Sequence, residues 1–441
     1  MKILVLTNLY PPHHAGIFDN RCAAVTEALR LRGHQMHVLT STHGMRSEQR
    51  DGFVERRLQL NGVFGHPHLT KFNEMKSLEV HNHDAVAETV QRFQPDVIHV
   101  FSLHGLSKSL IFTLRNLKLP TVYDVADHWL SAGIREDPWL RFWNAPSLPF
   151  LDSSTRTALE MSGERGRLDS TAPTRMRKGY ERLPMLFGDA KAIAAVEPNS
   201  IPSFRFDRIY FCSHTLKQLT EQVGFVVSHA EVIYPGIQTQ QFIGEIKPAS
   251  SPVTKFLIVE KLDKDSGVMT ALEALRQVRS IKLNASLSIY GRGESNYIAG
   301  LRSFVVRYQL PVEFLNVSNL VQDMPSVYRK HDALLYTPEW NEPFPVTPLE
   351  AMACGLPVIA SRAGGSNELF RHGENAFTYS PGNAAELAAR IQDLQRQPAL
   401  RGQMAETAQT EVLTKYNEST VTDQIENYLN TSQESWTHTA T

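Results

Sequence analysis

The chain has 441 residues, of which 42% are hydrophobic and 21% are charged. This composition is typical of a soluble globular protein and excludes a disordered or collagen-like chain, while the length predicts two domains, with three as the alternative. Lysine and arginine number 45 and aspartate and glutamate number 46, so the balanced charge does not indicate nucleic-acid binding. Three scattered cysteines exclude a disulfide framework and a Cys-based zinc site.

The N-terminus predicts a buried strand, because its apolar run is too short for a signal peptide. No stretch approaches the roughly 20 apolar residues that a membrane-spanning helix needs. We therefore expect a protein of the cytoplasm, which is a reducing compartment. A location at the inner face of the membrane is the alternative within this interpretation.

The first half of the chain alternates strand and helix patterns. Residues 2–6 and 35–40 predict strands on either side of a helix over 22–31, which makes a βαβ unit of the kind that builds parallel sheets. A further helix is predicted over 108–117. Further strands are predicted over 96–100, 120–123, 208–212 and 230–234.

Residues 137–190 differ from this pattern, because they are rich in Pro, Ser, Arg and Gly and have little apolar rhythm. They include Trp139, Trp143 and a basic run at 175–178. We interpret the segment as an insertion on the first domain. It is either a solvated surface loop or an element that binds the acceptor or a membrane surface, since cations and aromatic rings suit an anionic lipid interface.

A second α/β pattern follows a candidate linker at 244–254. A helix is predicted over 267–278, and the end of the chain is weakly helical over 410–429. Strands are predicted over 255–259, 285–290, 312–315, 332–337 and 356–360. The predicted fold is two Rossmann-like, doubly wound α/β domains, 1–248 and 252–413, which face each other across a cleft.

Residues 339–360 carry the most informative pattern. Thr347, Pro348 and Glu350 have the spacing of a capping box, which predicts a helix that begins near Pro348 and ends at Gly355. The N-terminus of such a helix suits a phosphate. Taken alone, Glu350 is a helix cap and Glu342, in the preceding proline-rich loop, is a solvated carboxylate. A glycine loop at 361–368 follows the next strand, and its backbone is able to approach a ligand closely.

Together these residues resemble a known family. Glu342 and Glu350 are separated by seven residues and precede Leu-Glu-Ala-Met-Ala-Cys-Gly-Leu-Pro-Val-Ile, which resembles the E-x7-E element of glycosyltransferase family 4. Residues 362–368 are similar to the Gly-Gly-x-x-Glu stretch of that family. Residues 11–16, 32–34, 95–99 and 103–107 resemble its N-terminal motifs. The resemblance covers both domains except the insertion.

The resemblance implies a retaining, hexosyltransferase-type enzyme of the GT-B fold. Such enzymes transfer a sugar from a nucleoside diphosphate sugar to a glycan, a lipid-linked sugar or a small molecule, without a metal or a further cofactor. It also implies that residues 414–441 return to the N-terminal domain. By the same resemblance, Glu342 contacts hydroxyls of the donor sugar and Glu350 contacts the ribose. The other implied donor-binding residues are Gly16, Lys261, Lys264, Phe344, Pro345, Val346 and Thr347.

The sequence departs from the family pattern at two places. Where the family has Gly-Arg-x4-Lys, this chain has Glu260, Lys261 and, at the final position, Ser266, so that Lys264 is the candidate replacement cation. Lys261 lacks the bidentate geometry of an arginine.

Ala126 replaces a histidine that the family carries near the end of a strand in the first domain. We name Glu342, His104, Asp127 and His128 as the candidate catalytic residues. His128 or His104 would compensate for Ala126, with a structural or surface histidine as the alternative. The departures leave open a non-catalytic, nucleotide-sugar-binding or scaffold protein of the same fold.

Overall fold

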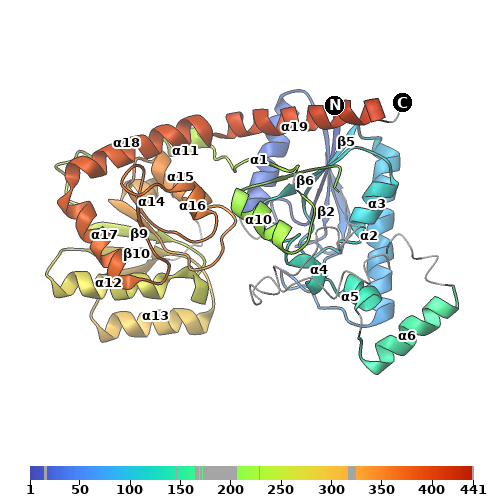
Figure 1. Ribbon diagram of the computed structural model, residues 1–441, viewed down its shortest axis with the longest axis horizontal. Helices are drawn as coiled ribbons and strands as arrows, with labels where there is room; N and C mark the ends of the chain where they lie inside the picture. Colours follow the sequence, from blue (N-terminus) through green and yellow to red (C-terminus); the bar gives the residue numbers. More distant parts are fainter. Residues whose placement is uncertain are drawn as a thin grey trace. The chain divides into compact units, whose positions relative to one another are not determined.

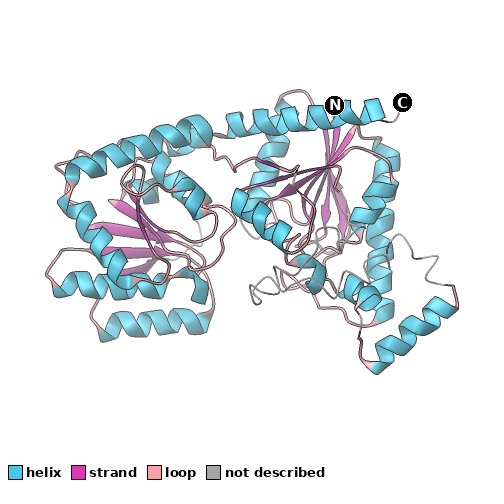
Figure 2. Ribbon diagram, viewed as in Figure 1, coloured by secondary structure: helices cyan, strands magenta, loops and turns pink. Residues whose placement is uncertain are grey.

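The computed structural model describes residues 1–13, 17–145, 147–163, 168, 171, 206–227, 229–315 and 324–439. The chain divides into two compact units (Figure 1). The first unit comprises Met1–Ile233 and Thr422–Thr441, and the second comprises Tyr234–Val421. In both units, helices pack around a sheet (Figure 2).

The first unit contains, among its described residues, an eight-stranded sheet in the order β3-β4-β2-β1-β5-β6-β7-β8. The pairings are parallel except that of β3 with β4. The strands are β1 (Lys2–Thr7), β2 (Gln35–Ser41), β3 (Gln49–Asp51), β4 (Val54–Leu58), β5 (Val97–Ser102), β6 (Thr121–Val125), β7 (Arg208–Phe211) and β8 (Glu231–Val232).

The described helices of this unit are α1 (Ile17–Leu31), α2 (Phe72–Phe93), α3 (Leu110–Asn116), α4 (Gly133–Glu136), α5 (Pro138–Asn144), α6 (Phe150–Met161), α10 (His214–Gln222) and the larger part of α19 (Glu418–Thr439). The central strands form because apolar runs such as residues 3–6 are buried on both faces of the sheet. The sequence analysis did not predict β3, β4 or α2.

The two tryptophans of the expected insertion lie in the core. Trp139 and Trp143 on α5 are 1% and 0% exposed, and their rings pack edge to face against each other. They contact Met75 of α2 within one buried cluster. Asp137 caps α5 by accepting hydrogen bonds from the backbone N–H groups of Trp139 and Leu140, both at 3.1 Å. Interpreting these tryptophans as part of a surface loop or a membrane-binding element was therefore wrong.

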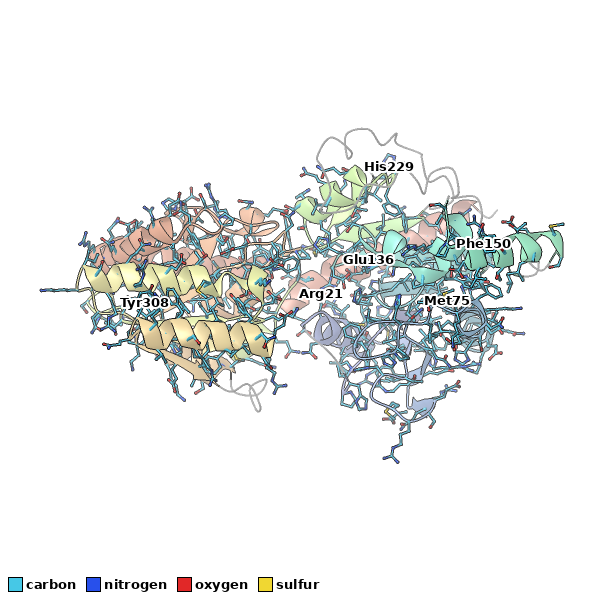
Figure 3. The ribbon with its side chains drawn as sticks, turned by 90° about the horizontal axis from the view of Figure 1, so that it is seen from below. Arg21, Met75, Glu136, Phe150, His229 and Tyr308 are labelled. Atoms are coloured by element: carbon cyan, nitrogen blue, oxygen red, sulfur yellow. The ribbon has the colours of Figure 1, made fainter. Side chains whose placement is uncertain are left out.

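The remainder of the expected insertion is only partly described. α6 begins at Phe150, whose side chain is 83% exposed (Figure 3). The basic run at 175–178 lies outside the described residues.

The second unit contains, in its described part, a six-stranded parallel sheet in the order β11-β10-β9-β12-β13-β14. Its strands are β9 (Lys255–Val259), β10 (Ser286–Tyr290), β11 (Val312–Leu315), β12 (Ala333–Tyr336), β13 (Val358–Ser361) and β14 (Phe377–Tyr379). Its described helices are α11 (Thr239–Phe242), α12 (Val268–Ser280), α13 (Ser295–Arg307), α14 (Met324–Arg329), α15 (Val346–Ala353), α16 (Ser366–Leu369), α17 (Ala384–Arg396) and α18 (Pro398–Lys415).

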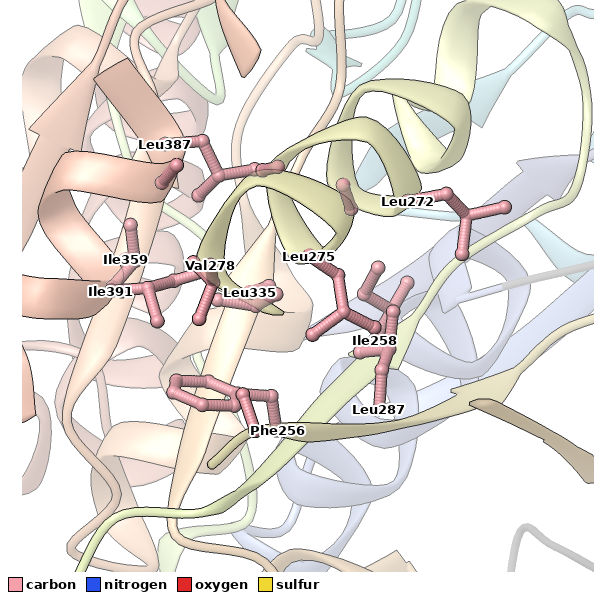
Figure 4. Close-up of a cluster of buried hydrophobic side chains, with 14 of the residues drawn as sticks. Phe256, Ile258, Leu272, Leu275, Val278, Leu287, Leu335, Ile359, Leu387 and Ile391 are labelled. Atoms are coloured by element: carbon pink, nitrogen blue, oxygen red, sulfur yellow. The ribbon is translucent and has the colours of Figure 1, made fainter. Parts of the chain in front are cut away.

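The core of the second unit joins the sheet to α12 and α17 (Figure 4). Phe256 of β9, Leu275 of α12 and Ile391 of α17 are each at most 3% exposed. Burial of apolar surface stabilises a fold by roughly 25 cal/mol per Å² removed from water. This core therefore stabilises the sheet whose strands are followed by the loops described below.

The boundary between the units lies earlier than the expected one at 248. Residues 234–248 belong to the second unit. The backbone N–H of Gly244 donates to the carbonyl of Ala353 at 3.2 Å, and the Lys247 ammonium lies 2.6 Å from Asp332 Oδ1. These contacts attach the segment to the second sheet and correct the expected range 1–248.

The last turns of α19 belong to the first unit. The Tyr428 hydroxyl donates to the carbonyl of Ile209 at 2.9 Å and accepts from the N–H of Ile209 at 3.1 Å. Glu426 pairs with Arg32 at 2.6 Å and with His34 at 2.8 Å. The C-terminal residues therefore complete the surface of β7 and α1.

Candidate functional site

The strand order of the second sheet changes direction between β9 and β12. From β9 the chain continues outward to β10 and β11, whereas β12 lies on the other side of β9 and leads to β13 and β14. Loops that leave a parallel sheet on opposite sides of such a switch point open a crevice, which is where α/β proteins bind ligands. Apart from Gly16, the residues predicted for the donor lie on the loops that follow these two strands or on α15, which follows the β12 loop.

The loop after β9 carries the two predicted lysines. Lys261 is exposed, and its ammonium pairs with Asp263 Oδ2 at 3.0 Å. Lys264 is exposed in a single 3₁₀ turn, Lys264–Ser266, which Asp263 caps by accepting a hydrogen bond from the N–H of Asp265 at 3.1 Å. Both cations are therefore exposed on the loop that follows β9.

Ser266, at the position of the family's second cation, is not available to a ligand. It is 2% exposed, and its hydroxyl donates to the carbonyl of Asp263 at 2.6 Å. Gly267 follows with φ +67°, and a Cβ there would lie 1.8 Å from the carbonyl oxygen of Thr337. The glycine thus lets the loop after β9 pack directly on the first residue after β12.

The loop that carries Glu342 is held by the glycine loop after β13. The N–H of Gly365 donates to the carbonyl of Glu342 at 2.7 Å. A Cβ at Gly364 would lie 2.5 Å from the backbone of Glu342, and one at Gly365 would lie 2.1 Å from the carbonyl oxygen of Pro343. The backbone of the glycine loop, which was expected to approach a ligand closely, therefore packs against the Glu342 loop. This contact fixes the position of the loop that carries Glu342.

The Glu342 carboxyl is in an unusual environment for a loop residue. Its Oε2 is buried and has no hydrogen-bond partner among the described residues. Burial raises the pKa of Glu342 well above its ordinary value, and the negative charge of Glu260 raises it further. Burial likewise raises the pKa of Glu260, to about 7. Oε2 of the half-buried Glu342 is thus withdrawn from solvent, and the sequence analysis did not single out Glu260 as a charge that acts on Glu342.

Glu350 does not cap its helix, so the predicted capping box was wrong. α15 begins at Val346 after Pro345, without a side-chain cap, and Glu350 lies in its second turn. Glu350 Oε2 instead accepts a hydrogen bond from the hydroxyl of Tyr328 at 2.7 Å. Burial raises the pKa of Glu350 to about 7, although this hydrogen bond opposes the shift. The helix ends at Ala353, and Gly355, which was predicted to terminate it, follows the C-cap Cys354 with φ +77°.

The predicted donor-binding stretch at the start of α15 is anchored from behind. Phe344 is 1% exposed, and its ring lies 5.0 Å from that of Tyr234 and 5.8 Å from that of Tyr416. Pro345 and Val346 are also buried, whereas Thr347 is half-buried. The backbone N–H groups of the first turn have no side-chain cap, which leaves a positive helix end at the switch point.

The first unit has its own switch point, between β1 and β5. A cavity of about 490 Å³ lies beside it and is lined by residues that follow both strands, such as Asn8 and His104. Arg21 and Glu136, labelled in Figure 3, also line it. The three predicted catalytic residues of this unit, His104, Asp127 and His128, all line this one cavity.

Asp127 is the central titratable group of the cavity. Its Oδ1 accepts a hydrogen bond from the N–H of Trp129 at 2.7 Å. Burial raises the pKa of Asp127, while the Trp129 N–H and the charges of His104 and His128 oppose the shift. His128 Nδ1 lies 3.3 Å from the Ser131 hydroxyl. Ala126, at the position of the family's histidine, lines the cavity as well and offers no polar group.

The cavity contains buried charged groups that the sequence analysis missed. Arg21 Nη1 pairs with Asp124 Oδ2 at 2.5 Å. The Lys108 ammonium donates to the carbonyl of Leu106 at 3.1 Å, and burial lowers the pKa of Lys108. Glu79 is 2% exposed, and its Oε2 has no partner in the described part of the chain. Only the placement of these residues at the switch point reveals them, since none belongs to a recognisable motif.

Gly16 lies outside the described residues. No three His, Cys, Asp or Glu side chains gather as metal ligands within the described ranges. The helices over the same ranges include none that is long and apolar enough to span a bilayer.

Two protein families match the chain. Residues 240–411 match Glycosyl transferases group 1, and residues 19–152 match the Glycosyl transferase 4-like domain. Glycogen synthase of Mycobacterium tuberculosis is 26% identical over 217 residues, which cover 49% of this chain and 52% of that protein. This match thus spans about half the length of the relative. An uncharacterized glycosyltransferase of Methanocaldococcus jannaschii is 23% identical over 442 residues, or 95% of each chain.

The fold is that of known GT-B structures. HepE of Anabaena, solved in complex with UDP and with UDP-glucose, superposes with a TM-score of 0.64 in the UDP complex. That match has 18% identity and covers 98% of this chain and 100% of HepE. Sucrose-phosphate synthase of Thermosynechococcus elongatus also gives a TM-score of 0.64, with 16% identity and coverage of 97% and 98%. Both units therefore have the parallel α/β architecture of that fold.

Proposed function

Because the chain carries a group 1 glycosyl transferase domain in its second unit and a glycosyl transferase 4-like domain in its first, we propose that it transfers a sugar from a nucleoside diphosphate sugar to an acceptor hydroxyl. Retention of the anomeric configuration and independence of metal are part of the proposal and derive from the resemblance of Glu342 and Glu350 to the E-x7-E element. The observation that carries the proposal is the placement of both carboxyl groups beside one switch point.

The donor would occupy the second unit. Glu350, oriented by Tyr328, accepts hydrogen bonds from the ribose hydroxyls, and Glu342 accepts them from the sugar. The free N–H groups at the start of α15 bind the diphosphate, together with the exposed Lys261 and Lys264. These cations and the helix end stabilise the negative charge that develops on the departing diphosphate. The complexes of HepE with UDP and UDP-glucose support a donor of this class.

The acceptor would occupy the cavity of the first unit. When the new glycosidic bond forms, the acceptor hydroxyl loses its proton and the bond from the sugar to the diphosphate breaks. Asp127 is the group in this cavity that we assign to take the proton, because burial raises its pKa and so makes its ionised form a stronger base. His104 and His128 line the same cavity and steer the hydroxyl toward Asp127.

Donor binding and turnover test the proposal together. Binding of UDP-, GDP-, ADP- and TDP-sugars to the purified protein is measured. The release of nucleoside diphosphate by hydrolysis of each sugar donor is then measured with and without a chelator. We expect release from one nucleotide class, unchanged by the chelator and lost in Glu342→Gln. The matched control is Glu313→Gln, which changes an exposed glutamate on β11. The absence of both binding and release for every nucleotide would contradict the proposal.

The second candidate is a binding protein without turnover. It is favoured by Ser266, a buried neutral residue where the resembling family has a cation, and by Ala126, which brings no polar side chain to the cavity. The same experiment separates the two candidates. Nucleotide sugars that bind but are neither hydrolysed nor transferred to any glycan, lipid-linked sugar or small-molecule acceptor would favour the binding protein.

A further inference from the structure

A loop between β4 and α2 forms one wall of the cavity in the first unit. Asn61, Val63 and Phe64 of this loop line the cavity. The N–H of Asn61 donates to the carbonyl of Gly105 at 3.0 Å, and Asn61 Oδ1 accepts from the N–H of Leu69 at 2.8 Å. A Cβ at Gly105 would lie 2.2 Å from Val63 Cγ2, so the loop also packs on the segment after β5. This wall is therefore held by contacts within the loop and with its neighbour.

Phe64 adopts a backbone conformation that a bulky residue rarely takes. Its φ is +52°, in the left-handed region where a Cβ comes too close to a backbone carbonyl. The side chain is 37% exposed, so burial does not offset this cost. The ring lies 5.5 Å from that of His104, edge to face, and 6.0 Å from that of His43. A strained, exposed aromatic residue on a cavity wall indicates a role in binding rather than in the fold.

Glu79 brings an unsatisfied polar atom to the same cavity. It lies on α2 and is 2% exposed, and its Oε2 has no hydrogen-bond partner in the described part of the chain. A buried oxygen without a partner costs free energy, and a ligand hydroxyl that donates to it removes this cost. The Lys108 ammonium, which donates to the carbonyl of Leu106 at 3.1 Å, also lines the cavity. The cavity thus combines an aromatic face with an acceptor and a donor that suit hydroxyl groups.

A pyranose ring has features that complement both parts of this cavity. Its hydroxyls lie around the rim of the ring, and each of them donates and accepts hydrogen bonds. Its C–H groups lie on the two faces, and their slightly positive hydrogens are attracted by the negative face of an aromatic ring. The cavity volume of about 490 Å³ lies within the range of sites that hold small organic ligands.

Two other classes of ligand fit the cavity less well. An alkyl chain would pack on Phe64 but would leave Glu79 Oε2 without a partner. A phosphate group would meet like charges, because the lining includes the carboxyl groups of Glu79, Asp127, Glu136 and Asp137. The cation Arg21 does not compensate for them, since it pairs with the buried Asp124 at 2.5 Å.

We propose that Phe64 determines the specificity of the first unit for its acceptor, and that the acceptor presents a neutral pyranoside. One face of the sugar ring stacks on the ring of Phe64, and one of the sugar hydroxyls donates to Glu79. The inference rests on the proposed function, because it names the class of acceptor for the transfer, although the binding of a sugar to this cavity is testable without a donor.

The first experiment measures sugar binding in the absence of a nucleotide. Methyl and octyl glycosides of glucose, galactose, mannose, rhamnose and N-acetylglucosamine are titrated by NMR into the wild type, Phe64→Ala and Phe64→Tyr. We expect at least one methyl glycoside to bind the wild type, and Phe64→Ala to weaken this binding about tenfold through loss of the aromatic face. Phe64→Tyr keeps that face and should restore the binding.

The control for this experiment is Phe150→Ala. Phe150 is an exposed phenylalanine of the same unit, on α6, and it is 83% exposed. Its replacement should leave sugar binding unchanged. Binding of octyl glycosides alone would show that Phe64 contacts an alkyl chain, and binding that Phe64→Ala leaves unchanged would show that the ring does not carry the sugar. Either result, or binding of no methyl glycoside, would overturn the proposal.

The second experiment tests the contact between Glu79 and a hydroxyl. Affinities of the bound glycoside and of its single deoxy derivatives are measured for the wild type and for Glu79→Gln. If Glu79 accepts from one hydroxyl, removal of that hydroxyl and replacement of Glu79 should be non-additive, whereas the other deoxy positions should add independently. Additive effects at every position would overturn the assignment of Glu79.

The third experiment needs no ligand and asks whether the Phe64 ring serves the fold. Glycine adopts the left-handed conformation without strain, so Phe64→Gly should keep or raise the melting temperature while it removes sugar binding. Phe150→Gly places glycine in a helix and should lower the melting temperature. A larger loss of stability in Phe64→Gly than in Phe150→Gly would show that the fold requires the ring, and would contradict the proposal.

Nucleotide binding separates this inference from the function on which it rests. The residues assigned to the donor lie in the second unit, so Phe64→Ala should leave the affinity for UDP, GDP, ADP or TDP unchanged. If a nucleoside diphosphate binds but no methyl glycoside does, the pyranoside site is overturned and the proposed function stands. If methyl glycosides bind through Phe64 but no nucleotide does, the proposed function fails and the sugar site remains.

Discussion

Tyr328 donates its hydroxyl hydrogen to Glu350 Oε2 at 2.7 Å, and the tyrosine that makes this bond is fully buried. The bond joins α14 to α15 and holds the carboxyl group that we assign to the ribose. It also opposes the effect of burial, which raises the pKa of Glu350 to about 7. The ionised fraction of Glu350 near neutral pH therefore depends on a residue that belongs to no motif.

We expect Tyr328→Phe to weaken nucleotide binding and to shift its pH dependence. Without the hydroxyl, the pKa of Glu350 rises further, so the ionised form that accepts from the ribose appears only at higher pH. Nucleoside diphosphate affinity should increase from pH 6 to pH 8 in the wild type, with a higher midpoint in Tyr328→Phe. Titration calorimetry across this range is the measurement. Identical midpoints in the two proteins would show that the hydrogen bond does not control Glu350.

Glu350→Gln and Glu342→Gln should affect different kinetic constants. If Glu350 binds the ribose, its replacement removes a charge-assisted acceptor and weakens nucleotide binding by about 1–3 kcal/mol, and it should also remove the pH dependence. Glu342→Gln should lower kcat more than nucleotide affinity, because a contact near the reacting carbon matters more in the transition state. Nucleotide affinity and kcat are measured for both. Equal effects on both constants in the two variants would contradict the separate roles.

Gly365→Ala should disturb the site through the backbone. The new Cβ would lie 2.1 Å from the carbonyl oxygen of Pro343, so the Glu342 loop must move. We expect a lower melting temperature and a large loss of turnover. The matched control is Gly300→Ala on α13, where the new Cβ meets nothing within 4 Å. There, alanine should stabilise the helix by about 0.5–1 kcal/mol. Wild-type turnover in Gly365→Ala would show that the contact between the glycine loop and Pro343 does not control the position of Glu342.

Asp127→Asn should lower turnover without changing donor affinity, because Asp127 lies in the cavity of the first unit and the donor residues lie in the second. Asparagine retains the acceptor for the Trp129 N–H, so the fold should persist. Transfer rate, donor affinity and melting temperature are measured together. A weakened donor affinity with normal transfer would place Asp127 in nucleotide binding instead.

Much of the fold was predictable because it depends on local sequence. The strands that were predicted contain apolar runs such as residues 256–259, and the E-x7-E spacing is contained within residues 342–350. α2 was missed because its 22 residues include histidines and many other polar groups, although its buried face packs on Trp143. The end of α15 was predicted because Gly355 has φ +77°, which glycine readily adopts.

The site was less predictable because its decisive contacts join distant segments. The sequence around Glu350 has the letters of a capping box, yet the helix already begins at Val346, directly after Pro345, and Tyr328 binds the carboxyl group. The effect of Glu260 on the pKa of Glu342 links loops that follow β9 and β12, and the spacing of residues does not reveal that these strands are neighbours. The same holds for Arg21 and Lys108, which reach one cavity from separate elements.

The return of α19 to the first unit has a consequence for the order in which the protein is made. The first unit begins with β1 but needs Glu426 and Tyr428 to cover β7 and the turn after α1, and these two residues follow the whole second unit in the sequence. The second unit, from Tyr234 to Val421, is complete in the chain before them. Since domains fold as units during synthesis, the second unit is able to fold before the first, which is completed only after residues 422–439 have been synthesised.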